Sequence, residues 1–198
     1  MKNEILYVLL DNYADHEPAF LASAITCDER GMKETPKFVN KTVAPTLDAV
    51  CSCGGFRTLP DYSLDTMPED YAALILIGGF GWLNGQEAER VVPIVRNAIG
   101  RGIIVGAICN AASFLARHGF LNNIRHTGNG LEQLKLWGGN SYTNEANYVN
   151  DRLVRQAYSY SQRHRLSGIL PKNFFYCLRT TLQNAREMFL SLLIKKDL

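Results

Sequence analysis

The amino-acid sequence predicts an α/β protein in which a mostly parallel sheet is covered by helices on both faces. Three continuous apolar runs, at residues 5–10, 72–77 and 102–108, have the length of strands and carry no polar face. Such runs are typical of strands that are buried on both sides of a sheet. A helical pattern follows each run, and strands that are joined through helices form parallel sheets.

The first part of the chain supplies one core strand, one helix and two shorter strands. Residues 5–10 (ILYVLL) form the first expected strand. A helix is predicted over residues 17–30, where apolar side chains recur at helical spacing. Two short strands are predicted at residues 37–42 and 47–53.

The middle of the chain repeats the order of strand and then helix twice. Residues 72–77 (AALILI) are the second core strand, and a helix is predicted over residues 87–99. Residues 102–108 (GIIVGAI) are the third core strand. The helix that leaves this strand is predicted at residues 110–117, so only Cys109 lies between the two elements.

The size and charge of the chain limit the classes of function. With 198 residues, the chain is expected to form one domain over residues 1–198. A net charge of +2, with 20% charged and 46% apolar residues, argues against nucleic acid or an anionic membrane as a partner. No window is apolar enough for a membrane span, and the first apolar run is too short for a signal peptide. The sequence therefore predicts a cytoplasmic protein that binds small molecules.

The five cysteines do not predict a disulfide framework, because their number is odd and no export signal is present. Cys51 and Cys53 form the motif CSC, but no histidine or further cysteine follows at the spacing of a four-ligand metal site. These two thiols are interpreted as small buried apolar groups. No metal and no cofactor are expected.

Three loops are expected to meet at one edge of the sheet. They are residues 11–17 (DNYADHE), residues 78–85 (GGFGWLNG) and the turn at Cys109, and each follows a core strand. An open parallel sheet binds its ligands beyond the carboxyl ends of its strands. The sequence therefore places the candidate site where these loops meet.

Cys109 is the strongest candidate for chemistry. A residue between a strand and a helix has to turn the chain sharply, which holds its side chain outward. Free N–H groups and the positive end of the helix dipole at that point favour a thiolate. The small neighbours Gly106, Ala107, Ala111 and Ala112 allow the turn to pack tightly. The alternative is a buried structural thiol.

Four stretches carry a resemblance to a known family: ILYVLLDNYADHE, LILIGGFG with Trp82, GIIVGAICNAASFLARHGFL and RHTGN. Together, over about residues 4 to 154, they resemble the ThiJ/PfpI superfamily of class I glutamine amidotransferase-like domains. The resemblance implies a flavodoxin-like three-layer sandwich with a cysteine nucleophile elbow, and a homodimer. It also implies that Cys109 is reactive, that Glu17 hydrogen-bonds to it, and that the N–H groups of Gly79 and Asn110 form an oxyanion hole.

The sequence departs from this family beside the cysteine. Members proposed as proteases have a histidine directly after the cysteine, whereas this chain has Asn110. His126 is the nearest substitute in sequence and is a candidate pocket residue, with a surface or helix-capping histidine as the alternative. His16 and Trp82 are the other candidate pocket residues. Glu17 has an alternative role as well, because an acidic residue at this position can cap its own helix.

The second departure is an atypical C-terminal segment at residues 155–198, which lacks the closing motif of the family. Alternating residues at 157–161 predict an edge strand, and residues 184–194 predict an amphipathic helix. A change of reading frame is one hypothesis for the departure, because codons permitted for residues 161–165 (SQRHR), read one base later, can encode Ala-Asn-Gly-Thr-Gly.

Three functions are compatible with these residues. The leading hypothesis is a cysteine-dependent hydrolase or lyase, glyoxalase- or deglycase-like, in which Cys109 and Glu17 act on small reactive carbonyl or amide-type substrates. The alternative is a dimeric redox or stress sensor that is oxidised at Cys109 without turnover. An intracellular protease or amidase is disfavoured, because no histidine adjoins the thiol.

Overall fold

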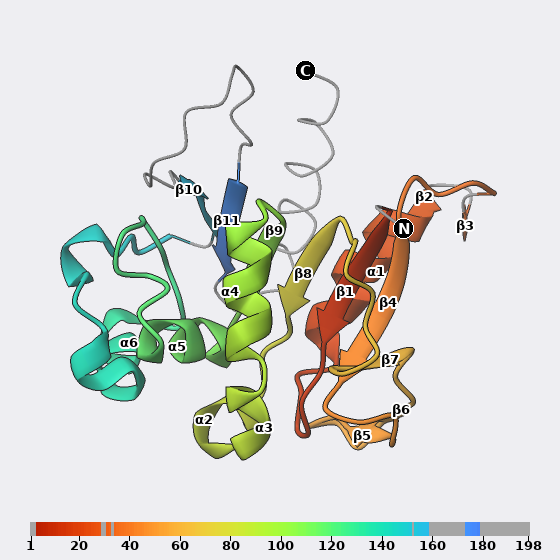
Figure 1. Cartoon of the computed structure of the whole chain (residues 1–198), viewed down its shortest axis with the longest axis horizontal. Helices are drawn as coiled ribbons and strands as arrows, with labels where there is room; N and C mark the ends of the chain where they lie inside the picture. The colour runs from red at the N-terminus through yellow and green to blue at the C-terminus, as the bar shows by residue number, and fades with distance from the viewer. Residues whose placement is uncertain (1–2, 29–30, 33, 152, 159–172, 179–198) are drawn as a thin grey trace.

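The computed structural model describes residues 3–28, 31–32, 34–151, 153–158 and 173–178, and these form a central sheet with helices on both faces (Figure 1). The sheet has seven strands in the order β10-β11-β9-β8-β1-β4-β7. Neighbouring strands are parallel, except for the antiparallel pair β10 and β11. The strands are β1 (Glu4–Val8), β4 (Val39–Ala44), β7 (Tyr62–Ser63), β8 (Ala73–Leu76), β9 (Ile104–Ile108), β10 (Leu153–Tyr158) and β11 (Asn173–Leu178).

The sheet separates two apolar cores, because successive side chains of each strand point to opposite faces. On β1, Leu6 and Val8 pack in the core that includes the helices α3 to α6. Ile5 and Tyr7 pack in the other core, against α1. Figure 1 shows α4 in front of β9 and α1 behind the sheet. The α/β class and the flavodoxin-like layering predicted from the sequence are therefore confirmed.

The helices and the short strands complete the described structure. The helices are α1 (His16–Thr26), α2 (Gly81–Asn84), α3 (Gln86–Glu89), α4 (Val92–Gly100), α5 (Asn110–Arg117) and α6 (Leu131–Gly138), with 3-10 turns at Gly139–Ser141 and Glu145–Asn147. Two small hairpins pair β2 (Cys27–Asp28) with β3 (Gly31–Met32), and β5 (Val50–Cys51) with β6 (Arg57–Thr58).

Three predicted boundaries are wrong. The helix expected over residues 17–30 ends at Thr26, because Cys27 begins the hairpin of β2 and β3. The helix expected over residues 87–99 is divided into α3 and α4, and Pro93 in the first turn of α4 marks the new start. The strand expected at residues 47–53 is limited to β5.

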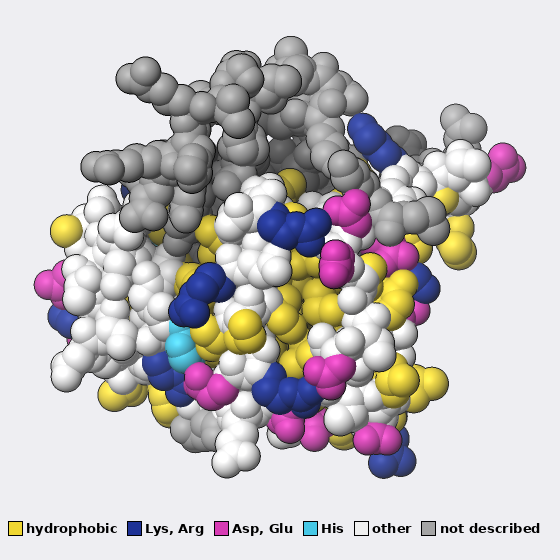
Figure 2. All heavy atoms as spheres, viewed as in Figure 1, with side chains coloured by type: hydrophobic (Ala, Val, Ile, Leu, Met, Phe, Trp, Pro, Cys, Tyr) yellow, Lys and Arg dark blue, Asp and Glu magenta, His cyan; other side chains and the backbone are white. Residues whose placement is uncertain are grey.

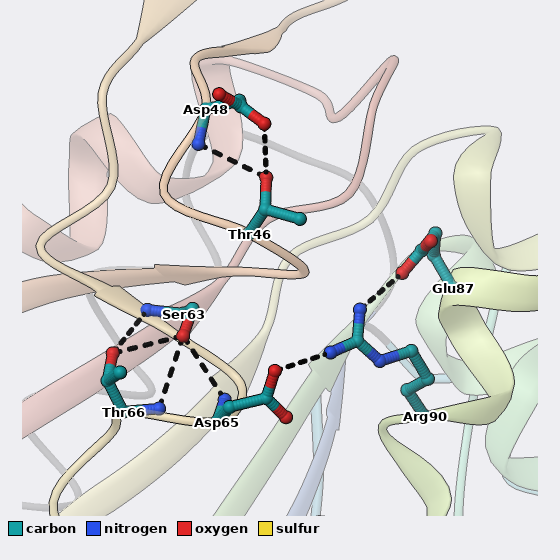
Figure 3. Close-up of polar contacts among 7 residues, drawn as sticks. All are labelled: Thr46, Asp48, Ser63, Asp65, Thr66, Glu87 and Arg90. Atoms are coloured by element: carbon teal, nitrogen blue, oxygen red, sulfur yellow. Dashed lines mark hydrogen bonds and ion pairs between the residues drawn. The ribbon is translucent and has the colours of Figure 1, made fainter.

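Arg90 stabilises the junction between α3 and α4 (Figure 3). Its guanidinium donates to Glu87 of α3 and to Asp65 of the loop after β7, both at 3.0 Å. Ser63 and Thr66 close the same loop, because the Ser63 N–H donates to Thr66 Oγ1 at 3.0 Å. These contacts hold the long connection between β7 and β8 against the helices.

The end of the chain is described in part. Residues 157 and 158 of the edge strand predicted at 157–161 belong to β10, which runs from Leu153 to Tyr158 and lies at one edge of the sheet. Residues 159–161 lie outside the described residues. The helix predicted at residues 184–194 lies outside the described residues. Within the described part of the chain, no helix has the length and apolar character needed to cross a membrane.

Candidate functional site

Cys109 forms a strained turn at the carboxyl end of β9. The strand ends at Ile108 and α5 begins at Asn110, so a single residue changes the direction of the chain. Cys109 has φ 54° and ψ −125°, and Asn12 is the only other described residue apart from glycine with a positive φ. Such backbone strain clusters at functional sites, and the turn has the geometry of a nucleophile elbow. The thiol is partly exposed and forms no disulfide.

Gly78, at the carboxyl end of β8, brings the backbone against the cysteine. A Cβ atom at this position would lie 2.5 Å from Cys109 Cβ and within 2.8 Å of both carboxyl oxygens of Glu17. Only glycine fits at such a distance. The absence of this one side chain therefore lets the thiol and the carboxyl group share one small space.

Glu17 lies in the first turn of α1 and is directed away from its own helix. Its Oε2 accepts a hydrogen bond of 2.7 Å from the Gly78 N–H. The N-cap of α1 is Asp15, whose side chain accepts from the His16 N–H. The role of helix cap, which was the alternative for Glu17, is therefore filled by Asp15.

Burial raises the pKa of Glu17 to about 7, although the Gly78 N–H and the Cys109 side chain both act to lower it. Glu17 is 5% exposed. Its second oxygen, Oε1, is buried and has no well-formed hydrogen bond among the described residues. A proton on this carboxyl removes the cost of burying a charge, so Glu17 is suited to hold a proton beside the sulfur at neutral pH.

Gly79 lies between Tyr13 and Asn110 in the loop after β8. Tyr13 and Gly79 pair in an isolated antiparallel bridge, and the residues on either side of them make its two hydrogen bonds. The Ala14 N–H donates to Gly78 O at 2.9 Å, and the Phe80 N–H donates to Asn12 O at 3.1 Å. The polar groups of Gly79 are therefore directed away from Tyr13, and its carbonyl accepts from Asn110 Nδ2 at 3.1 Å. This orientation is compatible with the predicted oxyanion hole.

Two residues that sequence reasoning missed complete the surroundings of the thiol. Asn129 Nδ2 donates to Cys109 Sγ at 3.1 Å. Gln133 Nε2, from α6, donates to Asn110 Oδ1 at 3.1 Å. The motif RHTGN included Asn129, but a polar residue in a loop has no periodic pattern that could have indicated its contact with the cysteine.

The other predicted site residues lie in different surroundings. His126 is fully buried, and its ring nitrogens contact Ile124 O at 2.9 Å and the Tyr142 hydroxyl at 2.6 Å. Both nitrogens are therefore engaged, and burial lowers the pKa of His126. Trp82 is 1% exposed and packs on Phe114 with ring centroids 4.8 Å apart. These two residues belong to the core, and the structure does not bring them to the thiol.

His16 differs from these two residues because it is exposed, at the start of α1 directly before Glu17. Its ring Nδ1 lies 3.9 Å from Asp15 Oδ1. The residue adjoins Glu17 in the first turn of α1, and its place in a pocket stays a prediction.

A second thiol lies near the site. Cys51 and Cys53 are both exposed, so the prediction that they are buried is wrong. Cys53 Sγ donates to Asn12 O at 2.8 Å. Burial and the nearby negative groups of Asp15, Cys109 and Glu17 raise the pKa of Cys53. No cluster of three metal-ligating side chains occurs in the part of the chain that the structure describes.

An open groove of about 500 Å³ lies away from the cysteine. Tyr71 and Arg101, which line it, precede β8 and β9, whereas Cys109 follows β9. Figure 2 shows this face with apolar side chains between charged ones. The groove therefore does not contribute to the chemistry at the elbow.

The fold and the site together define an α/β protein with a cysteine elbow at the carboxyl edge of its sheet. A model of the DJ-1/PfpI family matches residues 4–162. The chain therefore belongs to the DJ-1/PfpI family, as the sequence resemblance predicted.

Known relatives agree with this assignment. The chain is 38% identical over 125 residues to the uncharacterized protease YdeA of Bacillus subtilis, a match that covers 63% of this chain and 58% of YdeA. The structure is similar to the DJ-1 superfamily protein Atu0886 of Agrobacterium tumefaciens, with a TM-score of 0.74, 29% identity, and coverage of 97% of this chain and 90% of that one. A thiJ/pfpI family protein of Bacillus anthracis has the same fold, with a TM-score of 0.79, 24% identity, and coverage of 97% and 84%.

Proposed function

We propose that the protein is a cysteine-dependent enzyme in which the Cys109 thiolate, paired with Glu17, attacks small reactive carbonyl or amide-type substrates. The observation that carries this proposal is the space around Gly78, where the strained cysteine and a buried carboxyl group meet. A sulfur nucleophile and a group that can give or take one proton are the minimum that carbonyl addition requires.

The first chemical step follows from this pair. The sulfur electrons form a bond to the carbonyl carbon, and the π electrons of the C=O bond move to its oxygen. The N–H groups of Gly79 and Asn110 stabilise the resulting oxyanion. The Glu17 proton then passes to this oxygen, which yields a neutral hemithioacetal from an aldehyde and leaves Glu17 as a carboxylate.

The position of Glu17 favours aldehydes over amides. An amide requires a proton on its leaving nitrogen as well as stabilisation of the oxyanion, and Glu17 is the titratable acid found beside the sulfur. An aldehyde requires only one proton transfer. Glyoxalase- or deglycase-like chemistry on small aldehydes is therefore the proposed activity, as a lyase or a hydrolase.

Turnover of a panel of small aldehydes, amides and peptides by the wild-type protein and by Cys109→Ser tests the proposal. We expect aldehyde turnover by the wild type and none by the variant. Absence of turnover on every aldehyde by a folded wild-type protein would contradict the enzymatic function.

A redox or stress sensor is the second candidate, because the thiol is partly exposed, accepts a hydrogen bond from Asn129 and has no imidazole partner among the described residues. Two equivalents of hydrogen peroxide would convert the thiolate to a sulfinate and release two waters. Mass spectrometry after peroxide treatment tests this function. A sulfinate on Cys109 in a protein that turns over no substrate would support the sensor over the enzyme.

Peptide hydrolysis is less compatible with the site. YdeA is named as a protease, but in this chain both nitrogens of His126 are engaged in the core. A cysteine protease needs a base within hydrogen-bond reach of its thiol. Cleavage of a peptide by the wild type but not by Cys109→Ala would overturn this argument.

We also propose that the protein is cytoplasmic, as the sequence predicts, and forms a homodimer, as the family resemblance implies. Light scattering on the purified full chain measures its mass in solution. A monomer at micromolar concentration would contradict the dimer, and recovery of the protein outside the cytoplasm after cell fractionation would contradict its location.

A further inference from the structure

We propose that Asn129 stabilises the Cys109 thiolate, in the place where a cysteine hydrolase would use a histidine. The side-chain amide of Asn129 lies 3.1 Å from the sulfur and is the donor end of a network that includes Asn110 and Gln133. This inference deepens the proposed function and rests on it only in requiring that Cys109 reacts as a thiolate.

The orientation of each amide in the network follows from its fixed end. A backbone carbonyl can only accept, so Asn110 has to present its NH₂ group to Gly79 O, at 3.1 Å. Its Oδ1 is therefore directed to the other side, where it accepts from Gln133 Nε2 at 3.1 Å and faces Asn129 Nδ2 at 3.5 Å. Because Oδ1 cannot donate, Asn129 also has to present its NH₂ group, and the sulfur receives an N–H donor.

Asn129 is held in place by both sides of its loop. Thr127 Oγ1 donates to Asp151 O at 2.8 Å, and His126 pairs with Tyr148 in an isolated bridge. On the other side, Gly130 has φ 157° and α6 begins at the next residue. The buried His126 thus acts as an anchor of the loop that carries the sulfur donor.

The donor has a direct effect on the proton that Cys109 and Glu17 share. The Gly78 N–H favours the carboxylate form of Glu17, and the Asn129 N–H favours the thiolate form of Cys109. The two donors therefore compete for the position of one proton. A carboxamide does not titrate, so Asn129 stabilises the thiolate without taking the proton, as an imidazole base would.

Two substitutions at this position separate the donor from the shape of the side chain. Asn129→Ala removes the amide, and Asn129→Asp keeps its shape but replaces the donor by an acceptor. We expect alkylation of Cys109 by iodoacetamide at neutral pH to slow by about tenfold to a hundredfold in both variants, since a hydrogen bond to a charged group is lost. The rate should recover at alkaline pH, where the thiol ionises without help.

Infrared spectroscopy supplies a readout that a purely structural role would not change. In the wild type at neutral pH, difference spectra against Glu17→Gln should contain the carbonyl band of a protonated carboxyl group. In Asn129→Ala this band should weaken, because the proton returns to the sulfur. Asn122→Ala is the matched control: its amide donates to Ser141 O at 2.8 Å in another loop, so its loss should change thermal stability and leave alkylation unchanged.

The outcomes distinguish this inference from the proposed function. Unchanged alkylation rates in both Asn129 variants across the pH range would overturn the role of Asn129, even where aldehyde turnover depends on Cys109. Slower alkylation in both variants of a protein that turns over no aldehyde would leave the inference standing and remove the enzymatic function. If Asn129→Ala does not fold, the alkylation rate of Cys109 in the isosteric variant Asn129→Asp decides whether Asn129 has this role.

Discussion

Cys53 and Cys109 lie near one another on two different turns, and the two sulfur atoms have different hydrogen-bond partners. Cys53 is exposed, but its Sγ donates to the Asn12 carbonyl, and burial and negative neighbours raise its pKa. Cys109 is less exposed and accepts an N–H from Asn129. A carbonyl holds the proton on a thiol, whereas an N–H donor favours its loss. We therefore expect the hydrogen-bond partner of each sulfur, more than its exposure, to determine which thiol reacts faster.

The largest expected effect is the loss of reaction at Cys109. Cys109→Ser should reduce aldehyde turnover by at least about a thousandfold, because a hydroxyl is far less acidic than a thiol and is a poor nucleophile in its neutral form. Cys53→Ser should leave turnover within a factor of about two. Alkylation followed by mass spectrometry should find one fast site at neutral pH. Faster labelling of Cys53 than of Cys109 would reverse the comparison of the two turns.

The next effect concerns the proton at the elbow. Glu17→Gln keeps a hydrogen-bonding side chain but cannot transfer a proton, so turnover should fall by about a hundredfold or more while alkylation of Cys109 persists. Glu17→Leu should reduce both turnover and the alkylation of Cys109. Steady-state kinetics and alkylation rates measured on the same preparations separate proton transfer by Glu17 from its hydrogen bond to the sulfur. Equal turnover in all three proteins would remove Glu17 from the mechanism.

Stability should depend on pH through the same carboxyl group. The pKa of Glu17 rises from its ordinary value of 4.5 to about 7 on folding, so the protonated form is the one that the fold favours. The contribution of the protonated Glu17 to the free energy of unfolding is complete below pH 4.5. This contribution is lost as the pH rises through 7, which lowers the free energy of unfolding by up to about 3 kcal/mol. Urea unfolding across this range should show a slope that Glu17→Gln removes. An identical slope in the variant would assign the pH dependence to other groups.

The smallest effect tests the crowding that distinguishes the elbow. Gly78→Ala places a Cβ 2.5 Å from Cys109 Cβ and should destabilise the protein by about 1–3 kcal/mol. Gly100→Ala, at the end of α4 with no atom within 4 Å of the new Cβ, should be neutral or stabilise by up to about 1 kcal/mol. Urea unfolding measures both. A stability loss at Gly100 as large as that at Gly78 would remove the argument from crowding.

Strong periodic signals made most of the fold predictable. The three apolar runs became β1, β8 and β9, and α5 occupies residues Asn110–Arg117, the range that was predicted. The helices α2 and α6 were missed. The four residues of α2 are too few for a periodic pattern, and in α6 only Leu134 and Gly138 are buried, which leaves little apolar spacing to recognise. Pro93 did signal the start of α4, but the continuous apolar spacing suggested one longer helix.

The candidate site was predictable where a residue closely follows a core strand, and Glu17 was predicted from the family resemblance. Cys109 and Gly79 adjoin strands, so the topology alone brings them to one edge of the sheet. The carboxamides of Asn129 and Gln133 reach the same edge through tertiary packing of α6 against α5. Local sequence does not encode that packing. For this reason His126, the nearest histidine, was predicted as a pocket residue, and Asn129, three residues later, was missed.

The position of β11 has a consequence for the folding of this protein during its synthesis on the ribosome. β9, which ends at the cysteine turn, pairs with β8 on one side and with β11 (Asn173–Leu178) on the other. A nascent chain that has not yet released residue 178 leaves one side of β9 as an open edge, ready to pair with other chains. The strand behind the thiol is therefore completed only after residue 178 has left the exit tunnel.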